Sequence, residues 1–496
     1  MANETAQKLR GGYYTPADLA GFIARWIAGS APKRILEPSC GDGAFVQAIG
    51  ETPGLAGARV TGFEIDHAEA TKARLRAQDL SLAADIQASD FLGWALERFD
   101  RPAFDAVVGN PPYIRYQYLP PQHQARAEAV SARLNLRFTR HANAWTSFVL
   151  AGLRLLTPGG RLAMVLPAEL IQVMHAAPLR AHLLDQCRRL VLIDPRELWF
   201  DGALQGAVIL LAEKAHEPGD RREGLAVIPV AGRSFARACP ETLFREAEPL
   251  APEELVGKWT GAFLPRATRS LFAAARTQPG VRRFEEVAGV DVGIVTGANG
   301  FFLVDDAVVE RHGLAAFAHP MFGRSEHAPG LIYDAAQHRA NAAKGSPTNF
   351  LWFRNDADGA AANDYIAQGE AQGLHTRFKC RIRKPWYAVP SVHAAPVGML
   401  KRAHTAPRLI LNALGAYTTD TAYRIRPKGP DAAQLVAAFV NPLTALSAEL
   451  EGRGYGGGVL ELVPSEIEKL LVPLPESALD LPALDAAVRT RPHADV

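Results

Sequence analysis

The first half of the chain alternates short apolar runs with longer segments of helical character. The apolar runs, each short enough to be a strand, lie at residues 35–36, 60–65, 106–108, 161–166, 191–193 and 208–211. Apolar runs that recur between helical segments are typical of a mostly parallel sheet with helices on both faces. The sequence therefore predicts an α/β fold with a doubly wound, Rossmann-like sheet.

The second half differs in composition, with shorter apolar runs and many Gly, Pro and Asn residues. A polar stretch at 216–223 predicts a surface loop, and the domain boundary is expected between this loop and Pro265. We place it after residue 245, which gives an α/β domain of residues 1–245 and a mixed α+β domain of residues 246–496. Within the second domain, residues 292–303 are expected to form a hairpin around Gly297 to Gly300.

Composition excludes several classes of protein. The 496 residues include 48% apolar residues, enough for a sizeable core. No apolar run approaches the roughly 20 residues of a membrane span, and the first residues lack a signal-peptide core. The cysteines Cys40, Cys187, Cys239 and Cys380 have no metal-type spacing, so we expect neither disulfides nor zinc and a reducing cytoplasm as the compartment. The net charge of +2 does not by itself indicate a nucleic-acid partner.

The first predicted strand ends in Glu37 and is followed by Gly41 and Gly43. In doubly wound sheets ligands bind at the carboxyl ends of strands, where glycines let the backbone approach closely. The spacing is not Gly-x-Gly-x-x-Gly and no P-loop Lys-Ser/Thr follows, which disfavours a nicotinamide or ATP site. An acidic Glu37 suits a cationic ligand such as S-adenosylmethionine, which carries a sulfonium and an ammonium.

Two later strand ends extend this candidate cofactor site. The second strand ends in Glu64 and Ile65, and a carboxylate there can accept both hydroxyls of a ribose. Farther on, Asp90 and Phe91 supply an acceptor for an adenine amino group and an apolar wall. An ordinary strand–loop junction explains Asp90 taken alone, but the ordered series favours a cofactor that contains a nucleoside.

The tetrad Asn110-Pro111-Pro112-Tyr113 follows the apolar run 104–109. An amino group on a planar ring is a poor nucleophile because its lone pair is delocalised. The Asn110 side-chain oxygen and the Pro111 carbonyl can accept its two hydrogens and free the lone pair for attack. The prolines stiffen the turn, and Tyr113 offers a flat face on which an extracted base could stack. These residues predict direct methyl transfer to an amino nitrogen, without a metal; a proline-rich turn is the alternative.

Taken in order, Gly12-Tyr13-Tyr14-Thr15-Pro16, the Glu37 segment, Glu64, Asp90-Phe91 and the tetrad resemble the γ-class DNA amino-methyltransferases. The resemblance is to the adenine-N6 enzymes of Type II and Type IIG restriction–modification systems. It covers the first 245 residues closely and the remainder loosely. It implies a methyltransferase domain over 1–245, a DNA target-recognition domain over 246–496, a flipped-out adenine in double-stranded DNA as substrate, and the cytoplasm of a bacterium or archaeon.

The same resemblance assigns further residues. It implies that Thr15 and Pro16 cover the methionine end of the cofactor and that Phe148 lies against its adenine. It also implies a second base-stacking aromatic, for which Phe200 fits. Trp199 competes for that role, and packing in the core is an open alternative for either aromatic.

A basic stretch at 376–387 is the candidate DNA-binding segment of the second domain. Strand-like alternation would place its cations on one face, where a phosphate backbone could bind. The cations are Arg377, Lys379, Arg381 and Arg383, with Lys384 next in the chain. A solvated edge strand that carries charge against aggregation is the alternative.

Other activities stay open at this point. A cytosine-N4 methyltransferase uses the same chemistry, usually with Ser in place of Asn110. An RNA or protein-glutamine methyltransferase, or a catalytically silent DNA-binding specificity protein, is less favoured. A fused metal-dependent nuclease needs a Glu-x-Lys pair, and no Lys in the chain follows an acidic residue at that spacing. The first domain also begins close to residue 1, so we expect any partner nuclease to be separately encoded.

Overall fold

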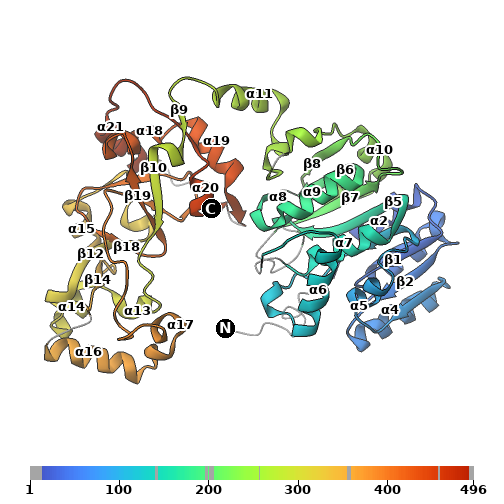
Figure 1. The fold of residues 1–496 in the computed structure, drawn as a ribbon, viewed down its shortest axis with the longest axis horizontal. Coiled ribbons are helices and arrows are strands. Elements are labelled where there is room, and N and C mark those ends of the chain that lie inside the picture. Colours follow the sequence, from blue (N-terminus) through green and yellow to red (C-terminus); the bar gives the residue numbers. More distant parts are fainter. Residues whose placement is uncertain are drawn as a thin grey trace. The chain divides into compact units, whose positions relative to one another are not determined.

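The computed structural model describes residues 14–139, 143–195, 199, 206–255, 257–354, 359–455 and 458–490. These residues form two compact units, Met1–Pro265 and Arg266–Val496, each with its own sheets and hydrophobic clusters (Figure 1).

An eight-stranded sheet of order β3-β2-β1-β4-β5-β7-β6-β8 forms the centre of the first unit. The first five strands in this order run parallel to one another: β1 (Arg34–Glu37), β2 (Arg59–Phe63), β3 (Ala84–Gln87), β4 (Phe104–Gly109) and β5 (Leu156–Pro167). The antiparallel β7 (Ala207–Lys214) lies between β5 and β6 (Cys187–Pro195), and β8 (Gly224–Val230) runs parallel to β6. The prediction of a mostly parallel α/β sheet is confirmed.

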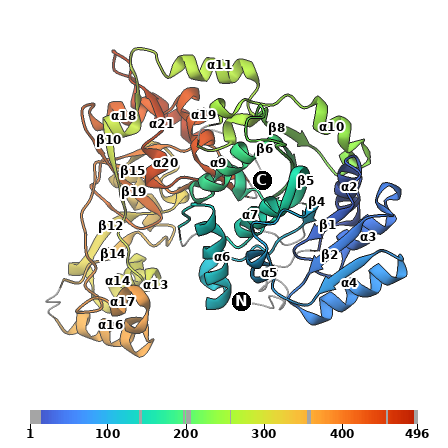
Figure 2. The same cartoon turned by 45° about the vertical axis from the view of Figure 1, so that its right-hand side comes forward.

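Helices cover both faces of this sheet, which explains why its strands read as continuous apolar runs. On β4, Val107 points into one cluster, whereas Ala106 and Val108 point into the other. The helices α2 (Ala17–Ala28) and α3 (Ala44–Glu51) pack on one side, and α5 (Phe91–Glu97) and α7 (Trp145–Leu155) on the opposite side (Figure 2). Beyond α3 lies α4 (His67–Asp79), and beyond α5 lies α6 (Pro121–Arg133).

The first unit continues past residue 245, where we had placed the domain boundary. Leu250, Leu255 and Trp259 are buried in the same cluster as the core of the sheet. The backbone N–H of Leu225 donates to the carbonyl of Leu250, and that of Trp259 donates to the carbonyl of Ile171. Because this segment covers one end of the sheet, the compact unit ends at Pro265 rather than at residue 245.

The second unit is mixed α+β and contains several small sheets. The largest has the order β10-β19-β15-β17-β13 and the next β11-β14-β12-β18, beside a three-stranded and a two-stranded sheet. The strands of the larger sheet are β10 (Ala288–Val292), β13 (Ile332–Tyr333), β15 (Val397–Leu400), β17 (Leu409–Asn412) and β19 (Ala422–Pro427). Those of the second are β11 (Leu303–Val304), β12 (Ala318–Phe322), β14 (Asn349–Leu351) and β18 (Tyr417–Thr418).

The predicted hairpin at 292–303 is wrong. Strand β10 pairs with β19, and β11 pairs with β14, so the two strands belong to different sheets. The residues between them carry α13 (Asn299–Phe302). The Thr296 hydroxyl accepts the backbone N–H of Ala298, and this local bond favours a helical turn over a hairpin turn.

The strand predicted for the basic stretch is also wrong. Residues 374–381 form two short helical turns, η9 (Leu374–Thr376) and α17 (Phe378–Arg381). Cys380 is fully buried among the aromatic residues of the second unit, and the helical turn then leaves Phe378 and Ile382 exposed. The cations therefore do not share one face of a strand.

Within the described ranges, no single helix is long and apolar enough to cross a bilayer. The helices α18 (Ala432–Ala438) and α19 (Pro442–Glu451) meet that criterion only as a pair, and they are bent by 79° relative to one another.

Candidate active site

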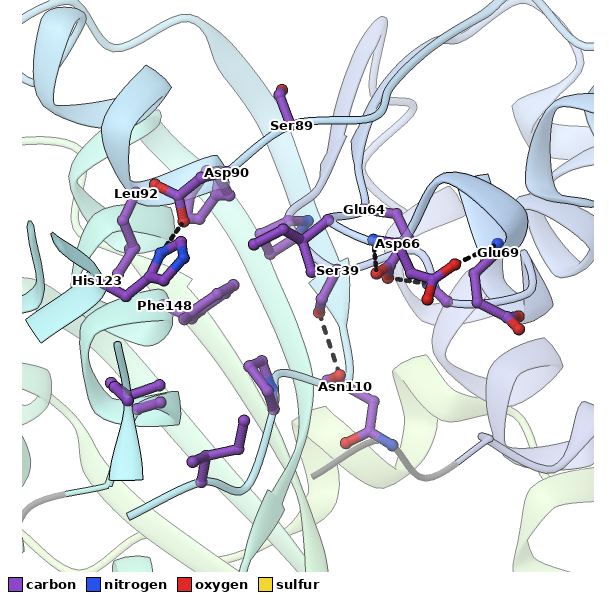
Figure 3. Close-up of a pocket in the computed structure, with 18 of the residues that line it drawn as sticks. Ser39, Glu64, Asp66, Glu69, Ser89, Asp90, Leu92, Asn110, His123 and Phe148 are labelled. Atoms are coloured by element: carbon purple, nitrogen blue, oxygen red, sulfur yellow. Dashed lines mark hydrogen bonds and ion pairs between the residues drawn. The ribbon is translucent and has the colours of Figure 1, made fainter. Parts of the chain in front are cut away.

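A cavity of about 470 Å³ opens at the carboxyl ends of the parallel strands in the first unit (Figure 3). Its lining comes from the segments that follow β1, β2, β3 and β4, together with the start of α2 and α7. Most of the site residues predicted in the first unit line it: Thr15, Gly41, Glu64, Ile65, Asp90, Phe91, Asn110, Pro112 and Phe148. The topology of the sheet therefore brings together residues that are far apart in the sequence.

Backbone N–H groups fix the carboxylate of Glu64 at the end of β2. One oxygen, Oε2, accepts the N–H of Gly41 at 2.9 Å, and Oε1 accepts the N–H of Asp66 at 2.9 Å. Gly41 has a φ of +52°, and the space where a Cβ would stand is open. The turn after β1 thus holds Glu64 in one orientation and leaves room for a ligand beside it.

Gly43 has another role than the one predicted, because it does not line the cavity. Its φ is +92°, and a Cβ at this position would lie 2.9 Å from the Cα of Ala73 in α4. Gly43 therefore allows α3 and α4 to pack closely behind the loop.

Glu37 is fully buried and does not line the cavity either. Burial raises the pKa of its carboxyl well above the ordinary value, with smaller contributions from the nearby charges of Glu64 and Asp42. Among the described residues, neither carboxylate oxygen of Glu37 has a hydrogen-bond partner. The geometry therefore gives no direct contact between this carboxylate and a ligand in the cavity.

Aromatic rings form the wall at the β3 end of the cavity. The ring centroids of Phe91 and Phe148 lie 5.4 Å apart. Beside them, the Asp90 carboxylate accepts the N–H of Gly93 at 2.7 Å, which caps α5. The same carboxylate pairs with Arg126 at 2.9 Å. It also pairs with the ring of His123 at 3.2 Å (Figure 3).

This network was not predicted, because His123 and Arg126 lie on α6 without a motif to identify them. It ties Asp90 to the segment that follows the tetrad. Both oxygens of the Asp90 carboxylate thus have partners within the protein, while Asp90 also lines the cavity. Ser39 and Asp66 also line the cavity, and their positions beside Gly41 and Glu64 are the signal that could have found them.

The tetrad begins where β4 ends, and its first residue faces the cavity (Figure 3). The side-chain amide of Asn110 donates from Nδ2 to the hydroxyl of Thr15 at 3.2 Å. The Ser39 hydroxyl donates to the backbone carbonyl of Asn110 at 3.1 Å. The segments before α2 and after β1 thus hold Asn110 by its side chain and by its backbone.

The other members of the tetrad lie differently. Pro112 lines the cavity, whereas Pro111 is buried and Tyr113 lies partly buried outside the lining. The hydroxyl of Tyr113 donates to the carbonyl of Val165 at the end of β5 at 3.1 Å, which anchors the edge of its ring. Pro16 does not line the cavity; it precedes the first residue of α2.

Of the two candidates for a second base-stacking aromatic, Phe200 lies outside the described residues. Trp199 is buried and stacks on Phe235, with ring centroids 5.5 Å apart. This contact supports the packing interpretation for Trp199.

The residues that the structure describes contain no group of three His, Cys, Asp or Glu side chains that could hold a metal ion. The five predicted DNA-contacting cations, Arg377 to Lys384, belong to the second unit.

Comparison with known proteins agrees with this arrangement. Residues 61–199 match the family model of the Eco57I restriction-modification methylase, and residues 256–496 match that of the C-terminal domain of the Type II methyltransferase M.Eco57I. The Type II methyltransferase M.XamI of Xanthomonas campestris pv. amaranthicola is 25% identical over 476 residues, covering 93% of this chain and 85% of the relative. M.AccI of Acinetobacter calcoaceticus is 22% identical over 491 residues, covering 95% and 86%.

A solved structure of a DNA complex shares the fold. The structure of DrdV bound to DNA matches with a TM-score of 0.51 and 13% identity, covering 86% of this chain and 50% of that chain. The type IIG restriction endonuclease BpuSI matches with a TM-score of 0.45 and 14% identity, covering 98% of this chain and 62% of that chain. This chain thus spans half or somewhat more of the length of these two enzymes. Since residues 61–199 and 256–496 match two parts of one methylase, the chain belongs to the Eco57I family of Type II restriction–modification methyltransferases.

Proposed function

We propose that this methyltransferase uses S-adenosylmethionine to methylate the N6 amino group of an adenine flipped out of double-stranded DNA. The observation that carries the proposal is the position of Asn110, which opens the tetrad and lines the same cavity as Glu64. Methyl donor and amino acceptor would then meet at one edge of the sheet.

The residues of the cavity fit the cofactor. A volume of about 470 Å³ lies within the range of small-molecule sites. The Glu64 carboxylate, oriented by two backbone N–H groups, is suited to accept the hydroxyls of a ribose. The ring of Phe148, backed by Phe91, offers an apolar surface for an adenine. When bound, S-adenosylmethionine supplies a methyl group that is electrophilic because it is attached to a sulfonium.

The chain supplies the activation of the amino group. With Nδ2 of Asn110 donating to Thr15, the amide presents Oδ1 as the acceptor that the target amino group needs. The Pro111 carbonyl is the second acceptor in this proposal. Two such bonds pull the nitrogen toward a tetrahedral geometry, and the lone pair can attack the methyl carbon directly. No covalent enzyme intermediate is required.

The base and the partners follow from the family and the second unit. Asn at the first position of the tetrad favours adenine over cytosine N4, which is the alternative substrate. Tyr113 is proposed to stack on the flipped base, and Phe200 keeps its predicted role on the other side. The shared fold with DrdV, which was solved with DNA, supports duplex DNA as the partner. A separately encoded restriction endonuclease would act on the same sequence.

The decisive assay incubates purified protein with labelled S-adenosylmethionine and methyl-free DNA, and identifies the modified nucleosides by mass spectrometry. N6-methyladenine supports the proposal, N4-methylcytosine changes the base, and label found only in RNA or protein overturns the assignment to DNA. Replacing Asn110 by alanine should lower the rate by about 10²–10³-fold while cofactor binding persists. Asn363→Ala, an exposed position in α16 (Ala360–Ala371), is the matched control.

A further inference from the structure

Two large apolar side chains are exposed within the basic stretch of the second unit. Phe378 is 62% exposed and Ile382 is 61% exposed. They stand four residues apart on a helical turn, so they share one side of it. We define the basic turn as residues 377–384.

Cations surround this apolar pair. The Lys379 ammonium and the Arg381 guanidinium each lie 5.6 Å from the centre of the Phe378 ring. Arg377, Lys379 and Arg381 are exposed, and within the described part of the chain they form no ion pair with a carboxylate. The turn therefore presents positive charge that no carboxylate among the described residues of the second unit neutralises.

Buried contacts fix the basic turn to the rest of the second unit. Cys380 is fully buried, and the Arg383 guanidinium donates to the carbonyls of Thr296 at 2.7 Å and Val295 at 2.5 Å. Just beyond the turn, Trp386 is buried and its indole N–H donates to Glu370 at 3.0 Å. Arg383 is thus a structural anchor rather than a free cation.

Gly297 allows this close packing. Its φ is +79°, and a Cβ at this position would lie 2.7 Å from the Cβ of Lys379. The segment from Thr296 to α13 therefore lies directly against α17, as both views show (Figures 1 and 2). A rigid base and an exposed apolar tip are the features that an inserting side chain needs.

We propose that the basic turn is a wedge that inserts Phe378, supported by Ile382, between neighbouring base pairs of the bound duplex. Arg377, Lys379 and Arg381 contact the phosphates on either side of the opened step. Proteins that bend or open DNA use apolar side chains flanked by cations in this manner. The inference rests on the proposed function, since it takes duplex DNA as the partner.

Salt dependence tests the phosphate contacts. The probe is sheared duplex DNA from a methylation-free strain, and its affinity for the full chain is measured from low to moderate salt. The triple variant with Arg377, Lys379 and Arg381 changed to Gln should lower the slope of log K against log[salt] by about 2.7, because each phosphate contact contributes about 0.9. A control triple changes the exposed cations Arg311, Arg339 and Lys344 to Gln and should leave the slope unchanged.

Permanganate reactivity of thymines tests the wedge, because it reports unstacked bases. Wild-type protein should create reactive thymines at fixed distances from its methylation sites, and these are scored apart from the unpaired thymine that faces each flipped adenine. Phe378→Ala should remove them and weaken binding on the order of ten-fold, whereas Phe378→Trp should retain them. Leu271→Ala, at a position that is 71% exposed in α11 (Arg266–Ala275), is the apolar control.

The outcomes separate the two proposals. Wild-type protein that neither binds nor methylates duplex DNA overturns both. If it methylates DNA but the triple variant keeps the full salt slope, or Phe378→Ala keeps the reactive thymines, only the wedge is overturned. A triple variant that loses affinity for RNA but not for duplex DNA also overturns the wedge.

Discussion

Replacing Thr15 by valine separates the positioning of Asn110 from the binding of the cofactor. The Thr15 hydroxyl accepts the Nδ2 hydrogen of Asn110 at 3.2 Å, and Thr15 is 7% exposed. Valine keeps the shape of the side chain but removes the acceptor. The Asn110 amide would then lose the contact that fixes which of its ends faces the target amino group.

The expected fall in kcat follows from the free energy of one hydrogen bond. A buried neutral hydrogen bond contributes about 0.5–1.5 kcal/mol net, and about 1.4 kcal/mol corresponds to a factor of ten in rate. We therefore expect Thr15→Val to lower kcat by roughly 2- to 10-fold. Thr15→Ser keeps the hydroxyl and should stay near the wild-type rate.

The assay measures methyl transfer at saturating DNA and saturating cofactor, beside the cofactor Kd from calorimetry. Positioning predicts a fall in kcat with little change in cofactor Kd. The reasoning fails if Thr15→Val leaves kcat unchanged, if its whole effect lies in cofactor Kd, or if Thr15→Ser is impaired as strongly as Thr15→Val.

Three further outcomes follow from the first unit. Glu64→Ala should weaken cofactor binding by at least about ten-fold in calorimetry, since it removes charged hydrogen bonds, and leave DNA affinity unchanged. Gly43→Ala should destabilise the fold by about 1–3 kcal/mol in denaturant titration because of its φ of +92°, whereas Gly57→Ala, with open space around its Cβ, should not. Burial raises the pKa of Asp194 to about 6, so the folded state binds the proton more tightly and stability falls as pH rises from about 4 to about 6. Asp194→Asn should accordingly raise Tm at pH 7.5, with a gain of at most about 3 kcal/mol in the free energy of unfolding. At pH 4 it should leave Tm unchanged.

The gathering of Glu64, Phe91 and Asn110 in one cavity could be predicted because parallel strands place their carboxyl ends at one edge. Glu64, Phe91 and Asn110 each follow a buried apolar run, and strand topology alone brings them to one cavity. The direction in which each side chain points was harder to predict from the sequence. Glu37 ends β1 as predicted, yet it is fully buried and does not line the cavity, because its position in the strand does not by itself fix where its side chain points.

The second unit was predicted less well because its segments are short and their partners are distant in sequence. Alternating cations from Arg377 to Arg383 are compatible with a strand, but burial of Cys380 and the bonds from Arg383 to residues 295 and 296 select a helical turn. The hairpin predicted for 292–303 was likewise overridden, because the strands that meet its two ends, β10 and β11, pair in different sheets. Tertiary contacts of this kind leave no local pattern in the sequence.

The contacts of Asn110 also bear on how the methyl donor and the target amino group would be aligned. Thr15 precedes α2 and Ser39 follows β1, and both belong to segments that border the cofactor cavity. A displacement of either segment would therefore move the side chain or the backbone of Asn110. Cofactor binding that orders these segments would also order the acceptor for the amino group. For this reason we expect substitutions in the segments of Thr15 and Ser39 to alter kcat even at saturating cofactor. Substitutions in the basic turn should act on DNA affinity instead.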